Sequence, residues 1–282
     1  GDTHLWHVWH GMQPLESFRN YPTRFCSEFG VESLPSMLAI RSFTDLEKPG
    51  LFDPVIQAHQ KSVGGNEKML YYILSKYRHP ASLEDFIYLS QLIQSETVRM
   101  ATEFWRRNSE RCHGAIYWQY NDCWPVASWA GIDYLKQYKA VQYRARHFNA
   151  MICVSAEMHA NRADVYGIND LKESFAGSLC WRLVDFNGQG IAKDELPVGL
   201  EKNTSRKLVS IPYKDVLGAI PKNNAALILE LKDQQGNIVS SQNNLLVADK
   251  EAALPKPTFK TSLAQHGQTG IISITPSSYS RF

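Results

Sequence analysis

The sequence predicts an α/β first half followed by an all-β second half. Up to about residue 150, short apolar segments alternate with segments whose apolar residues recur at helical spacing. Beyond that point the chain changes to short strand-like segments separated by Gly- and Asn-containing turns. We therefore expect an α/β part over residues 1–150, a β-sandwich over 151–250, and a linker with the start of a further, truncated β domain over 251–282.

The first half contains three apolar, strand-like segments that end in aromatic, amide or carboxylate residues. The segment over residues 24–30 ends in Glu28 and then breaks at Gly30. In a barrel of parallel strands, catalytic residues from several strands gather at the carboxyl ends. A carboxylate at such a strand end is where retaining glycosidases keep their nucleophile. The other two segments supply further candidates: Trp6, Trp9, His10, Trp118, Asn121, Asp122 and Trp124.

Two helices are predicted between and after these segments. Ser82 followed by Asp85 is typical of a helix amino-terminal cap, and helical spacing then continues to about residue 107. This helix leads into the segment over 114–119, which is the helix-then-strand order of a barrel unit. A second helix is expected from about residue 135 to 148. Its basic residues indicate a solvent-exposed face: Lys136, Lys139, Arg144 and Arg146.

The second half contains about seven predicted strands, a number and spacing typical of an immunoglobulin-like sandwich. The expected strands are 151–159, 162–170, 175–186, 191–200, 204–213, 225–233 and 238–247. Trp181 is expected in the core, and no disulfide is expected between Cys153 and Cys180. After the stiff Pro255-Lys256-Pro257 segment only one or two strands remain, and a lone hairpin is marginal in water.

Composition excludes several classes of protein. The formal net charge of the 282 residues is +2 and the basic residues are dispersed, so we expect no nucleic-acid partner. No apolar run approaches the roughly 20 residues that cross a bilayer, so we expect no membrane span. Periplasmic, extracellular and lysosomal locations all stay open.

Cysteine and histidine spacing indicate no metal centre and no cofactor. The five cysteines form no CxxC pair, which is typical of free, partly buried thiols. Cys26 lies near Glu28 but reads as a small apolar residue in a strand, not a nucleophile. His4, His7 and His10 would share a face on a helix, but the local composition favours a strand, on which His7 points the opposite way.

Three phrases of the sequence resemble a known family. They are Gly-Asp-x-His-x-Trp-x-Val-Trp-His from residue 1, Arg-Phe-x-Ser-Glu-Phe-Gly from residue 24, and Tyr-Trp-Gln-x-Asn-Asp-Cys-Trp-Pro from residue 117. In this order they resemble the last part of a β-mannosidase of glycoside hydrolase family 2. The resemblance covers most of residues 1–150 and continues more loosely beyond. It implies about strands six to eight of a (β/α)8 TIM barrel followed by a sandwich.

The resemblance also implies roles for individual residues. The family nucleophile, at the end of strand seven, corresponds to Glu28, and the stacking tryptophan of strand eight corresponds to Trp118. The family acid/base is a glutamate that follows asparagine at the end of strand four, before the segment with which this chain begins. Asn66-Glu67 comes after the nucleophile, so we interpret Glu67 as a helix-start residue favoured by the helix dipole. We therefore expect a fragment that carries the nucleophile but lacks the acid/base.

These observations lead to one main hypothesis and two alternatives. The main one is part of a retaining, exo-acting β-mannosidase that is inactive alone, with a β-mannoside or related oligosaccharide and the missing N-terminal part of the enzyme as partners. The second is another family 2 enzyme: an exo-β-glucosaminidase, β-galactosidase or β-glucuronidase. The third is a non-catalytic carbohydrate-binding or assembly module. Unpaired strand edges lead us to expect self-association of the fragment.

Overall fold

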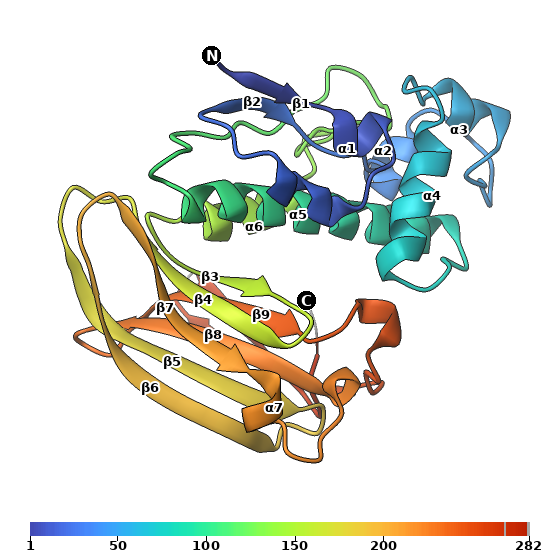
Figure 1. Ribbon diagram of the computed structural model, residues 1–282. Helices are drawn as coiled ribbons and strands as arrows, with labels where there is room; N and C mark the ends of the chain where they lie inside the picture. The colour runs from blue at the N-terminus through green and yellow to red at the C-terminus, as the bar shows by residue number, and fades with distance from the viewer. Residues whose placement is uncertain (268, 281–282) are drawn as a thin grey trace. The chain divides into compact units, whose positions relative to one another are not determined.

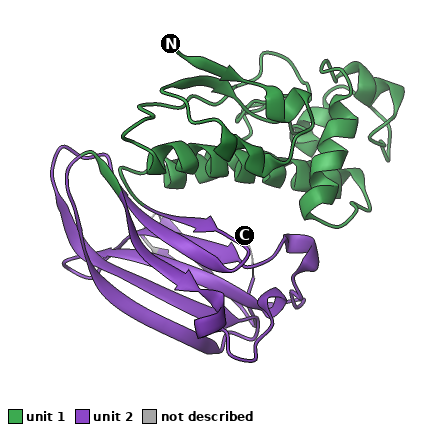
Figure 2. Ribbon diagram, in the orientation of Figure 1, with its two compact units in different colours: residues 1–153, 203–205 green, residues 154–202, 206–282 purple. Residues whose placement is uncertain are grey.

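The computed structural model describes residues 1–267 and 269–280. Residues Gly1–Cys153, together with Asn203–Ser205, form one compact unit. Residues Val154–Lys202 and Arg206–Phe282 form a second (Figure 2). The first unit mixes helices with short strands and the second is built mainly from strands (Figure 1), which confirms the predicted α/β and all-β order.

The strands of the first unit run side by side in parallel. Strand β1 (Thr3–Leu5) pairs in parallel with β2 (Cys26–Phe29). Cys26 also forms a parallel bridge with Ala115, on the far side of β2 from β1. The strand predicted over 114–119 is thus reduced to a bridge, although its backbone continues to hydrogen-bond to β2. Parallel neighbours of this kind, separated by long connections, are what successive barrel strands require.

The aromatic segment after β1 is helical, so the strand predicted there is wrong. Helix α1 covers His7–His10, and the N–H of Gly11 closes its last turn on the carbonyl of His7. The turn buries Val8 and Trp9 in the core of the unit. Burial against the rest of the chain therefore outweighs the strand preference of these aromatic and β-branched residues.

Six further helices of the first unit cover these strands. They are the 3-10 helix η1 (Leu15–Asn20), α2 (Met37–Arg41), α3 (Pro54–Ala58), α4 (Gly65–Lys76), α5 (Leu83–Arg107) and α6 (Ala140–Phe148). The predicted cap of α5 is confirmed, since the Ser82 hydroxyl accepts from the N–H of Asp85. Glu67 lies in the first turn of α4, as predicted.

Helix α6 begins later than predicted because an acidic side chain stabilises a turn in front of it. The carboxylate of Asp133 accepts hydrogen bonds from the N–H of Gln137 and from the N–H and hydroxyl of Ser36. Lys136 adopts a left-handed conformation, with φ of 64°. This turn delays the helix and places Lys139 at its amino-terminal cap.

All seven predicted strands of the second half are present within two residues of their expected ends. They are β3 (Ile152–Met158), β4 (Arg162–Asn169), β5 (Phe175–Asp185), β6 (Gly190–Leu200), β7 (Thr204–Pro212), β8 (Ala225–Asp233) and β9 (Ile238–Leu245). They form one sheet of order β3-β4-β7 and another of order β6-β5-β8-β9. Trp181 is buried, as predicted. Short helical turns occur in the connections: α7 (Tyr213–Val216), η2 (Lys222–Asn224) and η3 (Asp249–Glu251).

The last described residues form a separate antiparallel hairpin. Strands β10 (Phe259–His266) and β11 (Thr269–Pro276) pair with each other in a two-stranded sheet. The aromatic ring of Tyr279, just after the hairpin, stacks on Phe186 with ring centroids 5.1 Å apart. Throughout the part of the chain that the structure describes, no helix is both long and apolar enough to cross a membrane.

Candidate active site

Glu28 lies at the carboxyl end of β2 with 26% of its side chain exposed. Its Oε2 accepts a hydrogen bond of 3.0 Å from the indole Nε1 of Trp6. The same oxygen lies 3.4 Å from Nδ1 of His4, the residue that faces Glu28 in the β1–β2 register. The hydrogen bond from Trp6 fixes the position of this carboxylate oxygen. The Glu28 carboxyl group is therefore oriented by Trp6 and still reaches solvent.

His4 links Glu28 to a second carboxylate. Its Nε2 lies 3.5 Å from Oδ2 of Asp2, and that oxygen accepts a 2.6 Å hydrogen bond from the hydroxyl of Ser27. This hydrogen bond lowers the pKa of Asp2. The imidazole of His4 is thus held between two carboxylates, which fixes the orientation of the ring beside Glu28.

Tryptophan side chains pack behind Trp6. The ring of Trp129 meets Trp6 edge-on, with centroids 5.8 Å apart, and meets Trp9 edge-on at 6.1 Å. Trp9 is only 1% exposed, and its Nε1 donates to the hydroxyl of Ser62. Trp9 is therefore a core residue that supports the Trp6–Trp129 pair. Its assignment as a sugar-binding residue stays a prediction. Sequence reasoning did not select Trp129, because nothing local marks it as a neighbour of Glu28.

His10 and Trp118 lie at the exposed edge of the same region. The His10 ring lies 5.8 Å from that of Trp6. His10 is exposed overall, but partial desolvation, with the charge of Lys68, lowers its pKa. Trp118 is 43% exposed, and its N–H donates to the carbonyl of Phe29 at the end of β2. An exposed indole next to the strand that carries Glu28 is suited to stacking on a sugar ring.

Gly30 allows the chain that carries Trp118 to approach β2. A Cβ atom at Gly30 would lie 2.6 Å from the backbone carbonyl oxygen of Trp118, a contact that no flexible side chain can relieve. The glycine that ends the Glu28 strand is therefore required by close backbone packing.

We expect Gly30→Ala to cost roughly 1–3 kcal/mol of stability, because the backbone at Trp118 must move away. Urea unfolding followed by tryptophan fluorescence measures this cost. Gly199→Ala is the matched control, since a Cβ at Gly199 meets nothing within 4 Å. Equal unfolding midpoints for the two variants would contradict the close-packing argument.

The remaining predicted site residues are held by contacts of their own loop and its neighbours. Asn121 is exposed, and its amide donates to the carbonyl of Asp122. Trp124 stacks on His59 at 5.1 Å, and the ammonium of Lys61 lies 5.6 Å from the Trp124 ring centroid. As sugar-binding residues, Asn121, Asp122 and Trp124 stay predictions.

A buried polar cluster lies among the segments that follow Glu28 and Trp118. Lys139, predicted on an exposed helix face, is only 1% exposed, so that prediction is wrong. Glu32 is also 1% exposed, and its Oε2 accepts from the amide of Gln60. Burial raises the pKa of Glu32 to about 8 and lowers that of Lys139 to about 8. Asp122 is buried beside them, and burial raises its pKa although the charge of Lys139 opposes this.

Other reactive side chains near the site are structural. Cys26 is fully buried, and burial raises the pKa of its thiol to about 12, so it stays protonated as predicted for a small core residue. All five cysteines are free thiols. Within residues 1–267 and 269–280, no group of three His, Cys, Asp or Glu side chains is placed to hold a metal ion.

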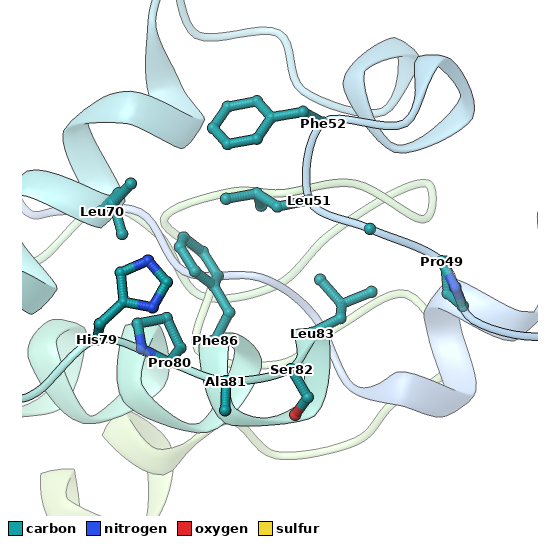
Figure 3. Close-up of a pocket in the computed structure, with 11 residues that line it drawn as sticks. Pro49, Leu51, Phe52, Leu70, His79, Pro80, Ala81, Ser82, Leu83 and Phe86 are labelled. Atoms are coloured by element: carbon teal, nitrogen blue, oxygen red, sulfur yellow. The ribbon is translucent and has the colours of Figure 1, made fainter.

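A cavity of about 330 Å³ lies away from these residues, beside the start of α5 (Figure 3). Its walls are mainly apolar, including Leu51, Leu70 and Phe86, and His79 is the titratable residue among those that line it. None of the predicted site residues lines it. The open strand end at Glu28, not this cavity, is therefore the candidate active site.

Comparisons with known proteins point to one family. Residues 161–251 match the family model described as a mannosidase Ig/CBM-like domain. A β-mannosidase B of Aspergillus terreus is 39% identical over 150 residues, which make up 51% of this chain and 18% of that protein. A β-mannosidase B of Aspergillus flavus is 31% identical over 207 residues, which make up 66% of this chain and 24% of that protein.

Solved structures extend the match to almost the whole chain. A β-D-mannosidase from Dictyoglomus thermophilum matches with a TM-score of 0.91 and 28% identity, over 99% of this chain and 34% of that one. An exo-chitosanase of Amycolatopsis orientalis shares the fold, with a TM-score of 0.76 and 16% identity, over 94% of this chain and 36% of that one. The chain therefore spans between about a fifth and about a third of the length of these proteins. The sequence and structural matches together identify the chain as a relative of the β-mannosidases of glycoside hydrolase family 2.

Proposed function

We propose that the protein containing this chain is a retaining β-mannosidase that releases terminal β-D-mannosyl residues, with Glu28 as its nucleophile. One observation carries the proposal: Glu28, the penultimate residue of the parallel strand β2, reaches solvent and accepts a hydrogen bond from Trp6. This is the setting that a carboxylate nucleophile needs, because it must be ionised and must face the sugar. The similarity to β-mannosidases supports the choice of sugar.

The proposed reaction has two steps. Glu28 attacks the anomeric carbon and forms a glycosyl ester while the bond to the leaving oxygen breaks, and an acid about 5 Å from Glu28 protonates that oxygen. The same acid, now a base, then takes a proton from water, which hydrolyses the ester with retained configuration. We assign the acid to another segment of the protein, so this chain alone carries the nucleophile and is inactive on natural mannosides. The exposed indole of Trp118 is the proposed platform for the sugar.

Trapping with 2-deoxy-2-fluoro-β-D-mannosyl fluoride tests this proposal. Its fluoride leaves without protonation, so ester formation at Glu28 does not need the acid. We expect mass spectrometry to find one added sugar on the peptide that contains Glu28. Hydrolysis of an aryl β-mannoside with the label on another residue would overturn the nucleophile assignment.

A panel of activated glycosides separates the alternatives. The corresponding aryl β-glucosaminide, β-galactoside and β-glucuronide are expected to react more slowly than the β-mannoside. A faster reaction with one of them would assign the protein to that activity instead. Sugar binding without any turnover, unchanged in Glu28→Gln, would favour a binding module.

In the whole protein that contains this chain, we expect Trp6→Phe to lower kcat by roughly 10–100-fold, because an aromatic ring is kept but the hydrogen bond that orients Glu28 is lost. KM for the aryl β-mannoside should change much less, since Trp6 acts on the carboxylate. Trp181→Phe is the matched control, because the buried Nε1 of Trp181 has no hydrogen-bond partner among the described residues. Equal kcat values for the two variants would contradict the orienting role.

A further inference from the structure

The buried ammonium of Lys139 forms hydrogen bonds to two segments of the chain and so links them. Its Nζ donates to the carbonyl oxygens of Ser33 and Ser128, both at 3.2 Å, and to the hydroxyl of Ser128 at 3.4 Å. Ser33 and Ser128 also bond to each other through their backbones in both directions, at 2.9 and 3.2 Å. An ammonium has three protons, and all three are used at this junction.

The junction joins the segments that carry the candidate site. Ser33 follows Glu28 along the chain, and Ser128 directly precedes Trp129. The carbonyl of Trp129 accepts from the N–H of Gln119, next to Trp118. The ring of Trp129 packs on Trp6, which donates to Glu28. A shift of one segment along the other would therefore move the indole that orients Glu28.

The surroundings of Lys139 keep its charge inside the protein. Three buried carboxyl groups interact electrostatically with it: Asp122, Glu32 and Asp133. The hydrogen bonds of Lys139 go to Ser33 and Ser128, so the carboxyl groups act on it at a distance. Asp122 and Asp133 supply the negative charge, because burial keeps Glu32 protonated below about pH 8. A buried ammonium is costly unless hydrogen bonds and opposite charges compensate it.

We propose that Lys139 is a positioning residue for the reaction at Glu28, acting through the Ser33–Ser128 junction on Trp129 and Trp6. The inference rests on the proposed function, because an effect on the reaction requires that Glu28 is the nucleophile. Lys139 touches neither the sugar nor Glu28. Its role is to hold the indole of Trp6 at hydrogen-bonding distance from the carboxylate.

The first test measures trapping by the 2-fluoro-mannosyl fluoride in Lys139→Met. We expect the saturating rate of ester formation to fall by about tenfold or more, with the half-saturating concentration changed less than about threefold. Lys139→Arg, which keeps the charge, should recover part of the rate. Lys136→Met is the matched control, because Lys136 is a nearby exposed lysine. A folded Lys139→Met with the wild-type rate would overturn the inference. If this variant does not fold, Ser128→Ala is measured instead, and its saturating rate of ester formation is expected to fall by about twofold or more.

The second test does not depend on turnover. The indole ¹H–¹⁵N resonance of Trp6, assigned by its loss in Trp6→Phe, should shift in Lys139→Met and stay in place in Lys136→Met. An unmoved Trp6 resonance in folded Lys139→Met would overturn the positioning role. Absence of trapping in the wild-type protein would instead reject the proposed function, and the resonance would still decide whether Lys139 positions Trp6.

Discussion

Glu28→Gln is expected to lower the turnover of an aryl β-mannoside by on the order of 10⁴-fold or more, as loss of a covalent nucleophile does. The amide has nearly the shape of the carboxylate, and its oxygen can still accept the hydrogen bond from Trp6. The fold should therefore be kept while the attacking charge is lost. Steady-state kinetics of the whole protein that contains this chain, as wild type and variant at matched concentrations, measure the change.

Two controls decide whether the loss is chemical. Glu67→Gln removes an exposed carboxylate in the first turn of α4 and should leave turnover unchanged. In Glu28→Ala, added azide is expected to restore turnover and to give the α-mannosyl azide, because the small anion attacks from the face that Glu28 vacates. Turnover within about tenfold of wild type in Glu28→Gln would assign the nucleophile to another residue.

Elements with local signals were predicted from the sequence almost to the residue. Helix α5 (Leu83–Arg107) has its cap, first turn and periodic apolar face within one continuous segment. The sandwich strands combine alternation with turn residues at both ends, and none is misplaced by more than two residues. Such elements are predictable because each local preference agrees with the final packing.

Elements whose conformation depends on distant residues were missed. The charge pattern around Lys139 is that of an exposed helix face. Its ammonium is nevertheless buried, because the carbonyls of Ser33 and Ser128 lie beside it. Ser33 is far from Lys139 in the sequence, and no local sequence pattern indicates that the two residues lie close together. The turn at Asp133 and the helical α1 have the same kind of cause, since tertiary contacts overrode local propensity.

The candidate site likewise combines residues that sequence motifs identify with residues that only tertiary contacts bring together. Glu28 and Trp6 belong to motifs that are visible in the sequence, and the structure brings these two side chains into contact. His4 joins them only through the register that pairs it with Glu28. Trp129 joins them through ring packing on Trp6 and through backbone pairing with a distant segment. A motif thus identifies the reacting group, and the pairing of distant segments determines what surrounds it.

The second large expected effect concerns Glu32, whose pKa is raised to about 8 by burial. A carboxyl with a raised pKa favours the folded state while it is protonated. That contribution is fully present below its ordinary pKa of 4.5 and is lost as the pH rises through about 8. Glu32→Gln mimics the protonated form at every pH. We expect the variant to equal wild type near pH 4.5 and to be more stable by a few kcal/mol near pH 8, at about 1.4 kcal/mol per pH unit between.

The sign of the stability difference between Glu32→Gln and wild type distinguishes a protonated Glu32 from an ionised Glu32 that pairs with Lys139. If Glu32 were ionised and paired with Lys139, removing one partner of that buried pair would destabilise the protein by about 3–5 kcal/mol near pH 7.5. The hydrogen bonds argue against such a pair, because the three protons of Lys139 are donated to Ser33 and Ser128. Urea unfolding of wild type and Glu32→Gln between pH 5 and 7.5 measures the sign. A more stable variant at pH 7.5 means that the ammonium is compensated at a distance, and that the Ser33–Ser128 junction, not Glu32, is what holds it in place.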